Sequence, residues 1–166
     1  MHHHLQAAWD AVNEAAGSLP PEVLGRPVPG KWSGADILEH LTLAFSANAA
    51  AFDKALASGT LKARPPKIWQ RLLAALVIGL GYFPKVETPE ATRPQRTIPP
   101  ERSVAAFRDA LLALDTAMAR VGQRFGDDVP AANHPYFAGL SVRQWRKFHW
   151  RHAVHHMRQL KERCSE

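Results

Sequence analysis

Four histidines lie in the stretch Phe148-His149-Trp150-Arg151-His152-Ala153-Val154-His155-His156-Met157-Arg158-Gln159-Leu160. The sequence predicts that this stretch belongs to a single helix. Ser141 fits the N-cap of that helix, and Gln144, three residues later, completes the pattern of a capping box. No Pro or Gly follows Gly139, so we expect the helix to continue without a break.

Three of the four histidines are expected to face the core. An α-helix turns by about 100° per residue, which places His149, His152 and His156 within roughly 60° of one another. His155 lies about 60° to the other side of His152, so we expect it to contact a neighbouring helix or water. The core-facing stripe also carries Trp145, Ala153 and Leu160.

Several neutral imidazoles on one core face need hydrogen-bond partners or a bound ion. Two histidines at i and i+4 are about 6 Å apart along a helix and can hold one metal ion. The alternative is that each ring bonds to a neighbouring group or to water, since a lone His-x-x-x-His spacing is common. His149 and His156 are about 10.5 Å apart along the axis, too far to share an ion. The geometry therefore leaves two pairs open, His149 with His152 and His152 with His156.

The rest of the chain predicts an all-α protein, an up-down-up-down four-helix bundle with an inserted short helix between the second and third main helices. Ser33 is the expected N-cap of the second main helix. No segment alternates long enough to predict a strand. The proline-containing segments 18–32, 58–66 and 84–100 are expected to be loops. The predicted helices are Leu5–Ala16, Gly34 to about Ala57, Lys67–Phe83, Pro100 to about Phe125, and the final helix after Ser141.

We expect residues 5–166 to form a single domain, with residues 1–4 either a tag remnant or a disordered start. The single cysteine, Cys164, cannot form an internal disulfide, and nothing resembles a signal peptide, so a cytoplasmic protein is expected. Cys164 lies about 12 Å beyond His156 along the helix and is not expected to be catalytic.

The net charge of +6 is scattered along the chain and accompanies no nucleic-acid motif, so we expect no nucleic-acid partner. The nearly apolar segment 67–83 is too short to span a bilayer, and no membrane partner is expected. We expect it to bury its apolar side against the bundle or against a second copy of the chain, which favours a homodimer. The charge suits a pocket for an anionic small-molecule substrate.

His40 at the edge of the second helix is either a boundary histidine half in solvent or a third ligand. Trp32-Ser33 shortly before Ile37-Leu38-Glu39-His40-Leu41, together with His152-x-x-x-His156-x-x-Gln159, resembles the DinB/YfiT-like superfamily. The segments His134-Pro135-Tyr136-Phe137 and Gly139-Leu140-Ser141, with Gln144-Trp145, resemble a branch of poorly defined function.

This resemblance implies a four-helix bundle of DinB/YfiT type with a divalent metal, zinc, nickel, iron or manganese. The metal ligands that it implies are His40, His152 and His156. It matches Gln159 to the glutamine that follows the last ligand. Around the metal we expect His149, Trp145, Gln159 and Trp32 to support the ligands from behind or to line the pocket.

Superfamily members are similar to thiol S-transferases that use bacillithiol or mycothiol, to a mycothiol-dependent isomerase and to hydrolases. The resemblance therefore implies a metal-dependent transferase or hydrolase that activates a thiol or water, with a low-molecular-weight thiol as co-substrate. The sequence identifies no catalytic side chain beside the metal, and it leaves open whether Asp36 and Glu39 point to solvent. The alternative function is a non-catalytic bundle that binds a metal or a small ligand.

Overall fold

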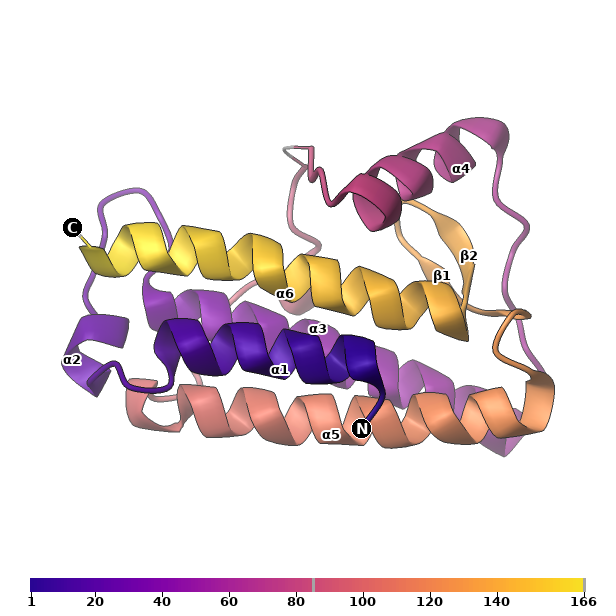
Figure 1. Ribbon diagram of the computed structural model, residues 1–166, viewed down its shortest axis with the longest axis horizontal. Helices are drawn as coiled ribbons and strands as arrows, with labels where there is room; N and C mark the ends of the chain where they lie inside the picture. The colour runs from indigo at the N-terminus through magenta and orange to yellow at the C-terminus, as the bar shows by residue number, and fades with distance from the viewer. Residues whose placement is uncertain (85, 166) are drawn as a thin grey trace.

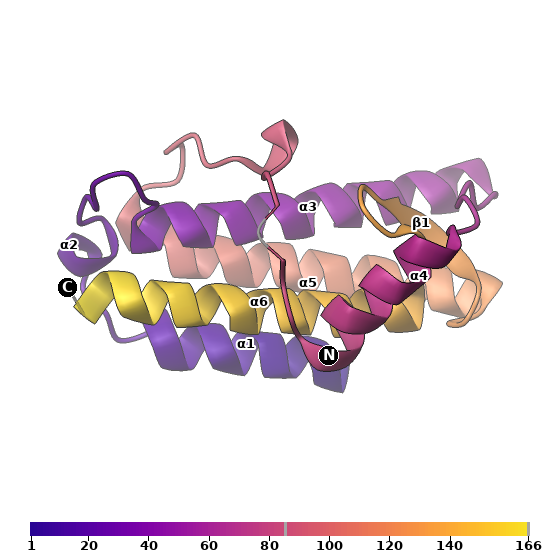
Figure 2. The same ribbon diagram turned by 90° about the horizontal axis from the view of Figure 1, so that it is seen from above.

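Four long helices enclose the core of the computed structural model, which describes residues 1–84 and 86–165. They are α1 (His3–Ala16), α3 (Gly34–Ser58), α5 (Pro100–Phe125) and α6 (Val142–Ser165), and they lie side by side in Figures 1 and 2. α3 packs mainly on α5, and α1 mainly on α6. The predicted helical bundle is therefore confirmed. Its largest fully buried side chains include Phe45, Phe52, Phe107, Leu111, Met118 and Trp145.

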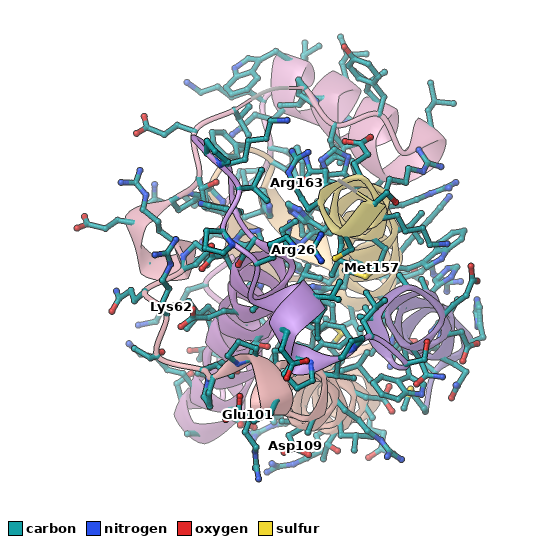
Figure 3. All side chains as sticks on the ribbon, turned by 90° about the vertical axis from the view of Figure 1, so that its left-hand side faces the viewer. Arg26, Lys62, Glu101, Asp109, Met157 and Arg163 are labelled. Carbon is teal, nitrogen blue, oxygen red and sulfur yellow. The ribbon has the colours of Figure 1, made fainter. Side chains whose placement is uncertain are left out.

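The view along the helices separates the inside of the bundle from its surface (Figure 3). Met157 points from α6 into the space between the helices, where it is buried. Glu101 and Asp109 project from the outer side of α5 and are exposed. This division follows the apolar stripe that the sequence of each helix predicts.

The predicted up-down-up-down order of the helices is wrong. Arg120 near the end of α5 pairs with Asp53 near the end of α3 at 3.4 Å, so these two helices run in the same direction (Figure 1). Lys161 and Glu14, near the ends of α6 and α1, pair at 2.7 Å and show that these helices also run together. The order is therefore up-down-down-up. The crossover over residues 59–99 is long enough to return along the whole of α3 before α5 begins.

The helix starts follow the predicted capping chemistry. The Ser33 hydroxyl accepts from the Asp36 backbone N–H at 3.1 Å, and the Asp36 carboxylate accepts from the Ser33 backbone N–H at 2.9 Å. Ser141 and Gln144 make the same reciprocal pair at the start of α6. α3 ends at Gly59, whose φ of 69° suits a residue without a side chain.

Outside the crossover, a short helix and a hairpin were not predicted. The proline-rich loop 18–32 contains the short helix α2 (Pro21–Leu24), because a proline is tolerated in the first turn of a helix. A two-stranded antiparallel hairpin, β1 (Pro130–His134) and β2 (Ala138–Ser141), precedes α6. Its strands are poor in β-branched residues. It is supported from outside by Arg64, whose carbonyl accepts from the Gly139 N–H at 2.9 Å.

The crossover carries α4 (Ile68–Ala74), which continues as a π-helix, η1 (Ala75–Leu80), and stops at Gly81 with φ 74°. The predicted helix over 67–83 is thus shorter and changes its winding. Its inner side is buried through Ala74, Val77 and Ile78, but its outer side lies outside the bundle (Figure 2). A short 3-10 helix, η2 (Glu90–Thr92), follows. None of the helices in the described ranges has the length and apolar character to cross a bilayer.

Candidate metal centre

Three histidines from two helices converge on one point. The Nε2 atoms of His40 and His152 are 3.3 Å apart, and those of His156 and His152 are 3.0 Å apart. One ligand atom from each of the three rings lies within 4.8 Å of the others, and the group is suited to hold a metal ion. α3 contributes His40, and successive turns of α6 contribute His152 and His156. The structure therefore brings together the three residues that the resemblance assigns to the metal.

His40 is buried rather than half in solvent, and its ring is held by the crossover. Its Nδ1 lies 2.8 Å from the carbonyl oxygen of Thr92. Because a carbonyl only accepts hydrogen bonds, this contact places the ring proton on Nδ1 and leaves a free lone pair on Nε2. The Trp32 ring packs at 5.2 Å from the His40 ring on another side. Both contacts orient the Nε2 lone pair of His40 toward the two histidines of α6.

Gln159 fixes the ring of His156 in the same way. Its carbonyl Oε1 lies 2.8 Å from Nδ1 of His156, so this nitrogen donates and Nε2 is again free. The amide Nε2 of Gln159 lies 3.3 Å from Nε2 of His155 and donates to it. The sequence predicts that His155 contacts a neighbouring helix or water. The structure connects it to His156 through Gln159 within α6, and it stacks the His155 ring on Phe83 of the crossover at 4.7 Å.

His152 lies between the other two ligands and is enclosed by aromatic rings. Phe148 stacks on it at 5.3 Å and Phe83, from the crossover, at 5.9 Å. Its Nδ1 is buried and has no hydrogen-bond partner among the described residues. Packing therefore orients this ring, in contrast to the hydrogen bonds that orient His40 and His156.

Burial keeps all three rings neutral, the form in which histidine binds a metal. Burial lowers the pKa of His40, although the bond to the Thr92 carbonyl partly opposes this. Burial, with His40 and His155 nearby, lowers the pKa of His156 to about 3. Burial and then the neighbouring His156 and His40 hold the pKa of His152 well below its ordinary value.

The donor set fits a divalent cation. Two of the three Nε2 atoms carry free lone pairs, fixed by the bonds at Nδ1, and face the third at 3.0 and 3.3 Å. Nitrogens that bind one tetrahedral zinc ion at 2.0–2.1 Å are about 3.3 Å apart. The single proton of a neutral His152 can lie on Nε2 and bond to only one of the other two nitrogens, whereas a cation binds the lone pairs of all three at once. A metal ion therefore accounts best for this arrangement.

The carboxylates of Asp36 and Glu39 do not point to solvent. Both side chains are buried and accept hydrogen bonds from the crossover, Asp36 from Arg96 Nε at 3.2 Å and Glu39 from the Arg96 N–H at 2.7 Å. Both carboxylates are thus occupied by hydrogen bonds to the crossover. No local sequence signal indicates this role, nor that of Thr92, because both depend on how the crossover returns.

His149 lies one turn before His152 and is completely buried, with neither ring nitrogen bonded within the described parts of the chain. The rings of Phe45, at 4.3 Å, and Trp145, at 5.5 Å, enclose it. Trp145 itself is satisfied, since its Nε1 donates to the Ala132 carbonyl at 3.2 Å. His149 and Trp145 therefore precede the ligands on α6 and lie toward the hairpin. Trp32 packs on His40, and Gln159 bonds to His156.

His134 in the hairpin is a further buried histidine that the sequence did not single out as a site residue. Its ring stacks on Phe137 at 4.1 Å, its Nδ1 accepts from the Tyr136 N–H, and burial lowers its pKa to about 3. Cys164 lies elsewhere, with its sulfur 3.2 Å from the position that a Cβ on Gly34 would take. Burial raises the pKa of this thiol, which makes it less reactive.

A family model described as "Protein of unknown function (DUF1569)" matches residues 4–163, nearly the whole chain. No curated protein and no solved structure matches the chain significantly.

Proposed function

Because the chain belongs to the DUF1569 family, whose description assigns no function, we propose from the site itself that the protein is a metal-dependent enzyme of DinB/YfiT type. It transfers a thiol to, or hydrolyses, a small-molecule substrate. The observation that carries the proposal is the convergence of three neutral Nε2 atoms from His40, His152 and His156.

The DinB/YfiT-like assignment is supported by the origin of the ligands. One comes from the second long helix and two, at i and i+4, from the last long helix. The glutamine expected after the last ligand, Gln159, is bonded to His156 at 2.8 Å. We propose that residues 5–166 are one domain organised around this site.

A divalent ion held by three neutral histidines retains its full positive charge, and when bound it supplies the Lewis acidity that makes water or a thiol nucleophilic near neutral pH. Zinc, nickel, iron and manganese are the candidates. The contribution of the chain is orientation and exclusion of water. Thr92 and Gln159 fix two of the ligand rings. Phe83 and Phe148 cover the third, which strengthens electrostatic interactions at the site.

We also propose which residues line the substrate pocket. His149 offers two buried ring nitrogens without partners among the described residues, and Trp145 and Phe45 surround it with apolar surface. We propose that His149, Trp145, Trp32 and Gln159 line the space next to the metal. A low-molecular-weight thiol is the proposed co-substrate for the transferase reaction.

A second candidate function is a non-catalytic metal- or ligand-binding protein. One observation favours it: the two carboxylates nearest His40 in the sequence, Asp36 and Glu39, are bonded to Arg96 and Thr97 and are not free to act as a general base. The two functions differ in turnover, since a binding protein takes up its ligand once and then stops.

The test begins with metal analysis of protein that lacks residues 2–4, because His2, His3 and His4 can themselves bind metal. One equivalent of metal is expected. The loaded protein is then given a low-molecular-weight thiol and an electrophilic substrate, and thiol consumption is followed. Sustained consumption that His152→Ala abolishes supports the enzyme. Stoichiometric binding without turnover supports the second candidate, and the absence of any bound metal contradicts the enzyme and the metal-binding form of the second candidate.

A further inference from the structure

We propose that Glu39 is a positioning residue for the metal ligand His40, and that it acts through the segment of the crossover that it anchors, Glu90–Thr97. This inference rests on the proposed metal site, since it concerns how well His40 binds the ion. Glu39 and His40 are neighbours on α3, but they do not act on each other directly. Glu39 hydrogen-bonds to Arg96 and Thr97 of the crossover, and Thr92 of the same segment hydrogen-bonds to His40.

Glu39 is buried, with 1% of the residue exposed, and its carboxylate accepts hydrogen bonds only from the crossover among the described residues. One oxygen, Oε2, accepts from the Arg96 backbone N–H at 2.7 Å. The other, Oε1, accepts from the Thr97 backbone N–H at 2.9 Å and from the Thr97 hydroxyl at 2.6 Å. A buried carboxylate is tolerated only with such partners, so the segment and Glu39 depend on each other.

The backbone at Arg96 is the second sign of a fixed segment. Its φ is 58°, in the left-handed region that residues with a side chain rarely adopt. Two bonds hold it there, the one from its backbone N–H to Glu39 and a 3.2 Å contact from its Nε to Asp36. Strain of this kind persists only where the surroundings determine the conformation. Without Glu39, the backbone is free to relax to an ordinary conformation.

Four residues before Arg96, the same segment reaches His40. The 3-10 turn Glu90–Thr92 is closed by the Thr92 N–H to the Pro89 carbonyl at 3.0 Å and by the Arg93 N–H to the Glu90 carbonyl at 3.1 Å. This turn directs the Thr92 carbonyl at His40 Nδ1, 2.8 Å away. The segment thus touches α3 at two places, and Glu39 provides the stronger attachment of the two.

The consequence for the metal follows from the tautomer of His40. The Thr92 carbonyl keeps the proton on Nδ1 and the ring oriented, so that Nε2 is free for the ion. Loss of an outer partner of this kind lowers metal affinity by roughly 10–100-fold. Trp32 still packs against the His40 ring, so we expect weaker binding and not complete loss.

The matched control is Glu87→Gln. Glu87 also lies in the crossover and pairs with Arg93 at 3.4 Å, but its carboxylate is exposed and, among the described residues, its ion-pair partner lies in the crossover and not on α3. The experiment compares Glu39→Ala, Glu39→Gln and Glu87→Gln, all without residues 2–4. Zinc affinity is measured by chelator competition, the visible spectrum of the cobalt(II) form reports ligand geometry, and thermal unfolding of the metal-free protein reports stability.

We expect roughly 10–100-fold weaker zinc binding and an altered cobalt spectrum for Glu39→Ala. Glu39→Gln keeps one acceptor oxygen but turns an amide NH₂ toward a backbone N–H, so its loss lies in between. Glu87→Gln binds like the unsubstituted protein. If Glu39→Ala does not fold, Thr97→Val, which removes only the 2.6 Å hydroxyl bond, takes its place with an expected few-fold loss.

Folded Glu39→Ala or Thr97→Val protein with unchanged zinc affinity and an unchanged cobalt spectrum overturns the inference, even if the melting temperature falls. That outcome leaves the metal site itself intact. Absence of zinc binding by the unsubstituted protein, in contrast, overturns the proposed function and this inference with it.

Discussion

The two halves of the crossover between α3 and α5 differ in how they meet the bundle. The second half, residues 86–99, is polar and extended, yet buried carboxylates on α3 hold it at Arg96 and Thr97. The first half, residues 59–83, contains the apolar helical segment α4 and η1, yet much of the apolar surface of that segment is exposed. Its exposed large hydrophobic residues are Ile68, Trp69, Leu72, Leu80 and Tyr82.

The difference shows that the polarity of a crossover segment does not by itself indicate whether that segment supports the candidate metal centre. Buried carboxylates carry a desolvation penalty, so their use on α3 to hold the second half indicates a role that needs a fixed geometry. Exposed apolar side chains in the first half indicate a surface that another molecule covers. We propose that this molecule is a second copy of the chain, in line with the homodimer expected from the sequence.

The largest effect on metal binding is expected from removing one of the three histidines that the second half of the crossover helps to position, through His40. His40→Ala, His152→Ala and His156→Ala should each weaken metal binding by more than the roughly 100-fold limit for outer partners. His152 faces both other ligands, so its loss is expected to be the most damaging. Metal stoichiometry of protein without residues 2–4 gives the measurement. His155→Ala and His149→Ala are the controls, and retention of metal by His156→Ala with loss in His149→Ala contradicts the assignment.

A large change in self-association of the protein is expected from substitutions on the exposed apolar face of α4. Leu72 and Ile68 lie one turn apart on the outer face of α4 and are 68% and 78% exposed. Each apolar side chain of this size contributes roughly 1.5–3 kcal/mol when it is buried. Ile68→Glu with Leu72→Glu should therefore convert a dimer into a monomer, as measured by light scattering during size-exclusion chromatography. Leu112→Glu on the exposed side of α5 serves as the control. An unchanged mass for the double variant refutes the dimer surface.

The metal-free protein should lose stability in acid because of its buried histidines. Burial lowers the pKa of His149 from 6.5 to about 3, with a smaller contribution from His134. The folded state therefore binds fewer protons than the unfolded state, and stability falls as the pH drops from 6.5 toward 3. At pH 5 one such histidine accounts for about 2 kcal/mol. Denaturant unfolding at pH 7.5 and 5 should show that His149→Leu reduces this loss. A pH dependence identical to that of the unsubstituted protein argues against the buried, neutral ring.

The smallest effect is expected at Cys164. Its thiol lies near the start of α3 and is not one of the three converging ligands, and burial raises its pKa. Cys164→Ser should leave metal content and thiol consumption unchanged, in both cases within about twofold. A clear loss of activity at constant metal content would falsify this assignment.

The sequence predicted the long helices because their ends carry local signals. The reciprocal bonds of Ser33 with Asp36 and of Ser141 with Gln144 are formed between residues three positions apart, and the apolar stripes require only the helical period. The three ligands were reached through the resemblance, since spacing left His149 and His156 as equal partners of His152. Only the three-dimensional arrangement brings His40 to them.

What the sequence could not predict depends on contacts between distant segments. The hairpin before α6 is held partly by Arg64, about 70 residues away, whose N–H donates to the Asn133 side chain at 2.7 Å. The burial of Glu39 depends on Thr97, and the orientation of His40 on Thr92. The direction of α5 depends on how far the crossover returns. None of these has a periodic or local signature.

The wide separation of the ligands along the chain determines when the site comes into existence. His40 and His152 are 112 positions apart, and the last ligand lies on the final helix. During synthesis, α3 leaves the ribosome long before α6, so the three histidines can meet only after His156 has been made. An ion bound by all three histidines would close one of the longest loops in the described chain, and it would stabilise the fold by about 2.7 kcal/mol when free metal is a hundredfold above its dissociation constant.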